Sequence, residues 1–388
     1  MTAHVLPRSA LRRLLGAVVR TEVQRLRGGS SHHLAAGDWS DETAIGDDGL
    51  GLDSLEQLGV LGALAETFLL GDGLLPETPP ARVGDWLDWV ERGRQAGPNS
   101  LMVRTSGSTG APKTCRHPVE SLVEEAGYFA TQFVQCRRVV ALVPASHLYG
   151  LIWTVLLPAS LGIPVVDRAL GSPLALMPGD LVVAVPEQWG AFVRMKPAVP
   201  IACVAVSSAG VLTDSMAVEL RGAGFSRVVD VYGSSETGAI AMRDAPSAGY
   251  ELLPRWELLA GDDDVQIVDR EGLVVPLPDH VEQLGPRHLR PVGRRDRAVK
   301  IGGLNVWPDR VAAVLRETDG VADIAVRLGE NGRLKAFVVA SARLGPAELL
   351  TALERVAAQR LSAVERPKSY SFGAQLPGNE MGKPADWD

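Results

Sequence analysis

The chain has 388 residues, a formal net charge of −7 and 46% hydrophobic residues. This length, with this apolar content, predicts two or three domains with cores of their own. The acidic balance argues against nucleic acid or an anionic membrane as the main partner.

Cysteine usage and the apolar runs narrow the class further. Three cysteines lie far apart in the chain, which argues against a disulfide framework or a zinc site. No basic-then-apolar leader opens the sequence. Prolines interrupt the most apolar region, Val139 to Val166, so it is interpreted as buried core rather than a membrane span. These features predict a cytoplasmic protein with no membrane partner.

The first 95 residues predict a small helical unit. A helical stripe of leucines and valines ends near Gly28-Gly29, and a long polar loop follows it to Asp48. Asp53-Ser54-Leu55 then opens a second helix that runs to Phe68. A last helix is predicted from Val83 to Val90.

This order of elements resembles an acyl or peptidyl carrier protein over residues 1–95. The resemblance implies that Ser54 receives 4'-phosphopantetheine. An exposed serine at a helix N-terminus can hold a phosphodiester near the positive end of the helix dipole. Two other interpretations stay open: an ordinary helix N-cap at Asp53 or Ser54, and a carrier fold that is kept only for packing.

The stretch Thr105-Ser106-Gly107-Ser108-Thr109-Gly110-Ala111-Pro112-Lys113 predicts a phosphate-binding loop. Glycines let backbone N–H groups crowd an anion, the hydroxyls add neutral donors and the lysine adds a charge. The stretch is not the P-loop of NTPases, because Pro112 stands where that motif needs a glycine. A flexible linker would need neither Pro112 nor Lys113.

Between this loop and residue 292, short apolar runs alternate with helical or loop segments, which is typical of a largely buried sheet in an α/β domain. A helix is expected from near His117-Pro118 to Phe133. The expected strands are Val139–Val143, Val165-Val166, Leu181–Val185, Ala202–Val206 and Val228–Val231.

Two polar clusters follow strands of this sheet. The first is Pro144-Ala145-Ser146-His147-Leu148-Tyr149-Gly150, and the second is Val231-Tyr232-Gly233-Ser234-Ser235-Glu236-Thr237-Gly238. A core histidine would explain the first, and a strand-to-turn transition would explain the glycines of the second. Neither explains Tyr232 and Glu236 together, and Mg²⁺ prefers a carboxylate plus phosphate oxygens.

With the phosphate loop, these clusters resemble the motifs of adenylate-forming enzymes (the ANL superfamily), in the family's order. The resemblance covers residues 105 to 383, and it is greatest with the short acyl- or aryl-acid AMP ligases of bacterial secondary metabolism. It implies an α/β adenylation core at 96–294 with a truncated N-terminal subdomain. A mobile α+β domain at 295–388 completes the chain, with strands at Ala322–Val326, Leu334–Val339 and Tyr370–Phe372 and a helix at Pro346–Leu361.

The resemblance also assigns roles in the core. It places His147 between the acid pocket and the nucleotide, and Tyr232-Gly233 against adenine. Ser235 would touch the α-phosphate or the carboxylate, and Glu236 would bind Mg²⁺. Ser207-Ser208-Ala209-Gly210 would line the acid and adenine pocket.

Further roles fall toward the C-terminus. Asp279 would bind the ribose hydroxyls, although the Thr-Gly that precedes this aspartate in the family is Leu-Pro here. Arg294 would lie near the ribose, Asp296 would be the hinge and Gly303 would line the pantetheine tunnel. Lys383 would be the catalytic lysine that reaches the carboxylate and the bridging phosphate oxygen.

The implied reaction joins a small carboxylic acid, aryl or acyl, to ATP as an acyl-AMP with release of pyrophosphate. The acyl group then passes to a pantetheine thiol of CoA, a separate carrier protein or Ser54. Positioning and charge neutralisation would carry the first step. Two alternatives remain open: activation of another group on the same fold, for instance nitrite toward an arylamine, and a non-enzymatic carrier or scaffold with a degenerate adenylation domain.

Overall fold

The computed structural model describes most of the chain, and the statements below concern those residues. They are 6–28, 34, 39–71, 78–105, 113–247, 249–260, 265–277, 279–294, 298–341, 345–377 and 387. No helix among them is both long and apolar enough to cross a membrane.

Three helices form the N-terminal part, as predicted. They are α1 (Arg8–Leu26), α2 (Ser54–Phe68) and α3 (Val83–Ala96). The last of these is six residues longer than expected, and three residues separate its end from β1 (Ser100–Thr105). One hydrophobic core runs from the helices into the rest of the molecule without a break. Whether residues 1–95 form a carrier-like domain stays a prediction.

A nine-stranded sheet forms the centre of the molecule, in the order β13-β14-β9-β8-β7-β6-β5-β3-β4. Its parallel part contains the five strands expected from the apolar runs. They are β3 (Arg138–Ala141), β4 (Val165–Asp167), β5 (Asp180–Ala184), β6 (Val204–Ser207) and the first half of β7 (Arg227–Ser234).

Period-two alternation along these strands fills both faces of the sheet. Val140, Val182 and Ala205 pack on one face with α7 (Pro186–Met195) and α8 (Asp214–Gly222). The intervening residues, such as Val139 and Val183, pack on the other face. This second core cluster contains residues of α1, α2 and α3 and of three further helices, α4 (Val119–Gln132), α5 (Leu148–Leu151) and α6 (Leu157–Leu161). A π-helical turn, η2 (Ile152–Leu156), joins α5 to α6.

No local pattern in the sequence predicts the antiparallel half of the sheet. It contains β8 (Gly238–Asp244), β9 (Tyr250–Leu252), β13 (Asp279–Gly285) and β14 (His288–Arg294). A small sheet lies outside it, with β10 (Trp256–Ala260), β11 (Val265–Asp269) and β12 (Val274–Pro276). The expected helix at His117-Pro118 begins at Val119, because Lys113–Pro118 form β2, which pairs with β1 on the two sides of the phosphate loop.

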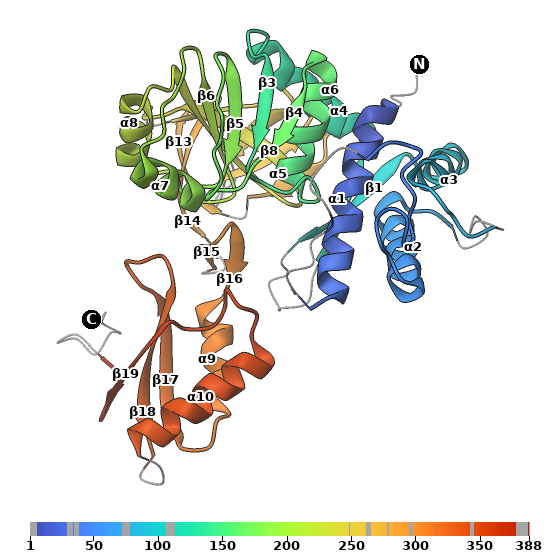
Figure 1. Ribbon diagram of the computed structural model, residues 1–388. Coiled ribbons are helices and arrows are strands. Elements are labelled where there is room, and N and C mark those ends of the chain that lie inside the picture. Colours follow the sequence, from blue (N-terminus) through green and yellow to red (C-terminus); the bar gives the residue numbers. More distant parts are fainter. Residues whose placement is uncertain are drawn as a thin grey trace.

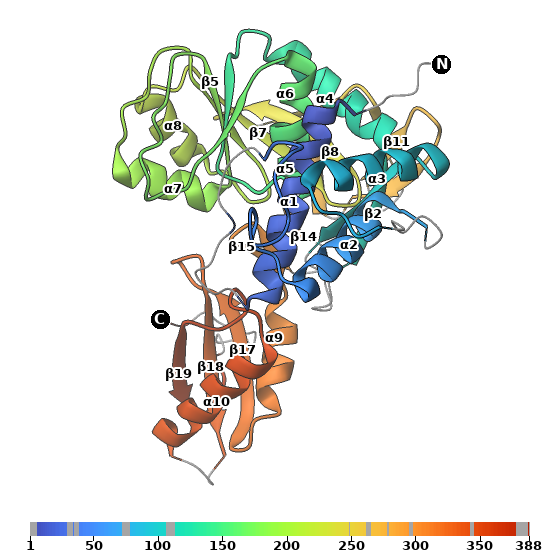
Figure 2. The ribbon, with the colours of Figure 1, turned by 45° about the vertical axis from the view of Figure 1, so that its right-hand side comes forward.

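A smaller unit with its own core forms the C-terminal end, below the large sheet in Figures 1 and 2. The hairpin β15 (Val299–Ile301) and β16 (Leu304–Val306) connects the two parts. The unit itself contains α9 (Pro308–Arg316), β17 (Val321–Leu328), β18 (Leu334–Ala340), α10 (Pro346–Arg360) and β19 (Ser369–Gly373). The expected α+β pattern is therefore present.

Candidate active site

The turn between β7 and β8 contains Ser235 and Glu236 and is built for close approach of the backbone. A β-bulge follows Tyr232, and a Cβ atom on Gly233 would stand 2.2 Å from the carbonyl oxygen of Gly238. Only glycine fits there. The Ser234 hydroxyl accepts hydrogen bonds from the backbone N–H groups of Glu236 and Thr237, both at 3.2 Å. The turn is therefore fixed by its own side chains, and the Glu236 side chain stays exposed.

A buried ion pair supports this turn from below, and sequence reasoning missed it. Both carboxylate oxygens of Glu125 accept the backbone N–H of Ala239 at 3.2 Å, and Arg255 Nη2 lies 3.1 Å from Glu125 Oε2. The same Arg255 nitrogen donates to the Thr237 carbonyl. Burial raises the pKa of Glu125 to about 7, against the lowering effect of Arg255. Gly238 leaves room for this pair, because a Cβ there would stand 2.6 Å from Glu125 Oε2.

His117 connects the phosphate loop to the same turn. It lies on β2, four residues after Lys113, and its Nε2 is 2.8 Å from the Ser235 carbonyl oxygen. Since a carbonyl only accepts, Nε2 carries the proton. Burial lowers the pKa of His117, so the neutral ring is favoured at neutral pH. No motif singled this residue out, because its partner is a backbone atom more than a hundred positions away.

The two residues assigned to the nucleoside lie together. Tyr232 Oη donates to Asp279 Oδ2 at 2.9 Å, at the start of β13. The Tyr250 ring stands edge-on to Tyr232 at 6.0 Å between centroids, and Tyr250 Oη donates to Asp230 Oδ2 at 2.5 Å. Burial raises the pKa of Asp230 to about 6. Arg243 stacks over Tyr250 at 4.9 Å, so a polar network holds the Tyr232 side from behind.

The predicted acid-binding motif opens the helix α5. His147 is the N-cap residue of α5, and it is exposed. The surrounding protein still removes enough water from its ring to lower the pKa of His147. Gly150 is required for this geometry, because a Cβ would stand 2.0 Å from the Pro144 carbonyl oxygen. The Tyr149 hydroxyl donates toward the carbonyls of Ala184 (3.2 Å) and Val206 (2.9 Å), at the carboxyl ends of two neighbouring strands.

An aromatic cluster fills the space behind Tyr149. Its ring lies 6.4 Å from that of Trp153, which contacts Phe129 at 4.5 Å and Phe133 at 5.3 Å. Trp153, Phe129 and Phe133 are all almost fully buried. The helix that follows His147 therefore packs on a solid aromatic base.

The expected pantetheine region lies beside the strand ends of the core. The Gly302 backbone N–H donates to Glu187 Oε1 at 3.0 Å, and an ideal Cβ on Gly303 would stand 3.8 Å from Ala209 Cβ. Ala209 has a positive φ of 63°, which non-glycine residues rarely adopt. The hairpin β15–β16 thus docks on the segment predicted to line the acid and adenine pocket.

The donors present fit a magnesium ion that is held largely by substrate. Among the described residues, no cluster of three or more His, Cys, Asp or Glu side chains forms a metal cage. Glu236 offers a single exposed carboxylate beside Ser235. Mg²⁺ is commonly bound by one or two carboxylates plus phosphates and water, so this side chain suits that role.

Several predicted site residues lie outside the described part of the chain. They are Ser106, Gly107, Ser108, Thr109, Gly110, Asp296 and Lys383. For Thr105, Lys113 and Arg294 the structure describes the backbone only: the first two residues pair across the β1–β2 hairpin, and Arg294 pairs with Asp279.

Ser54 occupies the first turn of α2 and is exposed. The N-cap is Asp53, whose side chain accepts the Glu56 N–H at 2.8 Å, while Glu56 accepts the Asp53 N–H at 3.1 Å. This capping box leaves the Ser54 hydroxyl outside the cap. The interpretation of Asp53 as a helix cap is confirmed, and modification of Ser54 stays a prediction.

Comparison with known proteins places this geometry in a family. A family model described as AMP-binding enzyme matches residues 91–285. A 4-coumarate–CoA ligase of Rhodobacter capsulatus is 35% identical, over 97% of this chain and 100% of the relative. One from Halorhodospira halophila is 34% identical, over 96% and 97%. The o-succinylbenzoate CoA synthetase of Bacillus subtilis shares the fold, with a TM-score of 0.60 at 19% identity over 74% of this chain and 68% of that one.

The fold and these matches define the class as an AMP-forming ligase. The chain belongs to the AMP-binding enzyme family. It activates a carboxylic acid with ATP as an acyl-AMP and transfers the acyl group to a thiol, as the sequence motifs predicted.

Proposed function

We propose that the chain is a hydroxycinnamate-type aryl-acid ligase that uses CoA as its thiol acceptor. The observation that carries this proposal is the end-to-end match to two 4-coumarate–CoA ligases of nearly the same length. The match extends over the N-terminal helices, which supports treating them as part of the same ligase as the adenylation core.

The acid side of the site supports a short, rigid substrate. Tyr149 and the buried Trp153–Phe129–Phe133 cluster leave the space behind the predicted acid-binding motif filled with rings. A long flexible chain would need to displace these close-packed side chains. A planar aryl acid can instead stack at the open side, near His147, where the ring is exposed.

The roles of individual residues are part of this proposal. Tyr232 and Asp279 would hold adenosine, Ser235 and Glu236 the α-phosphate and Mg²⁺, and the loop 105–113 the outgoing pyrophosphate. When bound, Mg²⁺ supplies charge neutralisation at the phosphates. The chain's own donors then orient the carboxylate for attack on the α-phosphorus.

Lys383 and Asp296 complete the proposal at the C-terminal end. Lys383 would reach the reacting oxygens during the first step, and Asp296 would be the hinge between the core (96–294) and the C-terminal domain (295–388). The contact of Gly302 with Glu187 supports the second step, because it places the glycine hairpin beside Ala209, where a pantetheine arm would enter.

A second candidate acceptor is a pantetheine carrier, either a separate protein or Ser54 of this chain, as in enzymes of secondary metabolism. The exposure of Ser54, clear of the capping box, favours this alternative. The continuous core under α1–α3 weighs against a carrier that swings freely.

The test uses mass spectrometry to measure the products formed from ATP, CoA and a panel of aryl, aryl-acrylic and fatty acids. The proposal expects the CoA thioester of an aryl-acrylic acid and AMP as products, with Ser54→Ala equally active. Thioester formed only after treatment with a phosphopantetheinyl transferase, and lost in Ser54→Ala, would favour the carrier. AMP formed with nitrite and an arylamine but with no acid would overturn the ligase assignment.

A further inference from the structure

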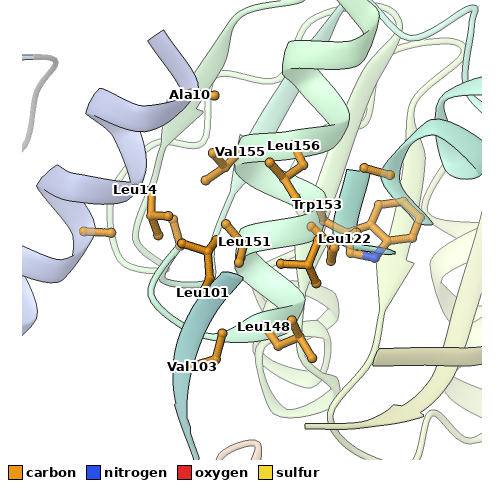
Figure 3. Packing of buried hydrophobic residues seen from close by; sticks show 14 of the residues in the cluster. Ala10, Leu14, Leu101, Val103, Leu122, Leu148, Leu151, Trp153, Val155 and Leu156 are labelled. Carbon is orange, nitrogen blue, oxygen red and sulfur yellow. The ribbon is translucent and has the colours of Figure 1, made fainter. Parts of the chain in front are cut away.

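The N-terminal helix α1 packs directly against the helix that follows the acid-binding motif. Figure 3 shows Ala10 and Leu14 of α1 facing Leu151 and Val155. These residues belong to one buried cluster. In addition, the hydroxyls of Thr21 and Ser146 are hydrogen-bonded at 3.1 Å, next to His147. The N-terminal helices therefore contact the acid side of the site and not only the outer surface.

A proline leaves one carbonyl of this second helix short of its usual donor. In an α-helix the carbonyl of residue 154 would accept the N–H of residue 158. Residue 158 is proline and has no N–H, and the preceding turn widens into the π-helix η2. Thr154 is fully buried, so water does not supply a donor.

Arg13 of α1 supplies a donor to this carbonyl. Its Nε donates to the Thr154 carbonyl at 2.6 Å. Its two terminal nitrogens donate to the carboxylate of Asp167 at the end of β4, Nη2 to Oδ1 at 2.6 Å and Nη1 to Oδ2 at 3.1 Å. The Arg13 side chain is 11% exposed. One guanidinium thus joins α1, the helix after His147 and the edge strand of the sheet.

We propose that Arg13 is a positioning residue for acid activation, acting through the Thr154 carbonyl on the helix that begins at His147. Thr154 lies about two helical turns after His147, so a shift at Thr154 moves the start of the helix with it. The nucleotide side, which Tyr232 and Asp279 form on other strands, does not depend on this contact. Arg13 therefore affects the apparent affinity for the acid and does not affect the apparent affinity for ATP.

This inference rests on the proposed role of His147 at the acid, and it is tested by acid-dependent ATP–pyrophosphate exchange. Arg13→Ala is expected to raise KM for the acid ~10-fold or more, with KM for ATP changed less than ~2-fold. Arg12→Ala is the matched control. Arg12 is the neighbouring residue on α1, and it pairs with Asp41 inside the N-terminal part. Its KM for the acid is expected to stay within ~2-fold of the unaltered enzyme.

A second-site variant tests the cause. In the double variant Arg13→Ala with Pro158→Ala, residue 158 regains an N–H for the Thr154 carbonyl, so KM for the acid is expected to recover most of the loss. Arg13→Lys keeps the positive charge but loses the planar guanidinium. Its KM for the acid is expected to lie between the values of the unaltered enzyme and of Arg13→Ala. If Arg13→Ala is insoluble, the same split between the two KM values is sought in Arg13→Lys.

Equal rises in KM for acid and ATP in the Arg13 variants, or no recovery in the double variant, would overturn the proposal. An unaltered enzyme that shows no exchange with any acid would instead refute the proposed function itself. Exchange in the unaltered enzyme with an unchanged acid KM in Arg13→Ala would refute only the positioning role.

Discussion

The buried carboxyl of Glu125 predicts a pH dependence of stability that a single substitution should remove. Glu125 lies under the turn that contains Ser235 and Glu236, and burial raises its pKa to about 7 from an ordinary value of 4.5. The folded state therefore holds a proton that the unfolded chain releases between these two pH values. Stability falls as pH rises through this window, because ionisation in the folded state is penalised.

The size of the effect follows from the two pKa values. At about 1.4 kcal/mol per pH unit, the interval corresponds to roughly 3 kcal/mol lost between about pH 4.5 and 7. Arg255, 3.1 Å away, already offsets part of the penalty in the ionised state. Glu125→Gln has nearly the same shape and cannot ionise. Relative to it, the unaltered protein should lose up to this amount as the pH rises.

The assay compares thermal midpoints of the unaltered protein and Glu125→Gln from pH 5 to pH 8. Every other titrating group is common to both, so the difference isolates Glu125. We expect the unaltered protein to lose several degrees relative to the variant across this range, since about 1 kcal/mol moves the midpoint by ~2–4 °C in larger domains. A difference that stays constant from pH 5 to pH 8 would refute the reasoning.

Three further substitutions test other parts of the site. Gly233→Ala should reduce pyrophosphate exchange by at least ~10-fold, because its Cβ meets a carbonyl across the turn. The exchange rate measures this effect, and an unchanged circular dichroism spectrum is the control for folding. Tyr232→Phe loses the hydrogen bond to Asp279 and should raise KM for ATP by ~5-fold, at about 1 kcal/mol, with KM for the acid unchanged. Glu187→Ala removes the acceptor of the Gly302 N–H and should slow thioester formation severalfold while pyrophosphate exchange persists. Pyrophosphate exchange slowed by the same factor would contradict this prediction.

The sequence predicted the elements whose pattern is local. Apolar runs gave the five parallel strands, and the helix from Ser54 to Phe68 followed from its leucine stripe and its Asp53 cap. The motif around Tyr232 is contiguous, so its resemblance to the family's motif is visible in the sequence, and its role at the nucleotide stays a prediction. Its link to Asp279 followed from family spacing, and the structure brings the two side chains within hydrogen-bond distance.

What was missed depends on contacts between distant segments. β13 and β14 are mostly exposed and contain several charged residues, so they lack an apolar signature. His117, Glu125 and Arg255 act through backbone atoms of a turn more than a hundred residues from the first two, and no local pattern marks such partners. The expected helix starts about two residues early, at the end of the strand Lys113–Pro118, and this strand has no local signal because its neighbour β1 lies across the phosphate loop.

The N-terminal helices illustrate the same limit of prediction from local sequence. These helices are visible in the sequence, and their resemblance to a carrier domain rests on their order and on Asp53-Ser54-Leu55 at the start of the second helix. The contact between Arg13 and Thr154 spans 141 positions and depends on a proline in the second helix. Only the folded chain brings these two features together.

The most direct measurement of the central claim is acid-dependent ATP–pyrophosphate exchange without any thiol, with 4-coumarate as the acid and Lys383→Ala alongside. The two-step ligase chemistry predicts exchange that requires both the acid and Mg²⁺ and falls by orders of magnitude in Lys383→Ala. Absence of exchange with 4-coumarate and every other carboxylic acid of the panel, in protein that still binds ATP, would contradict it.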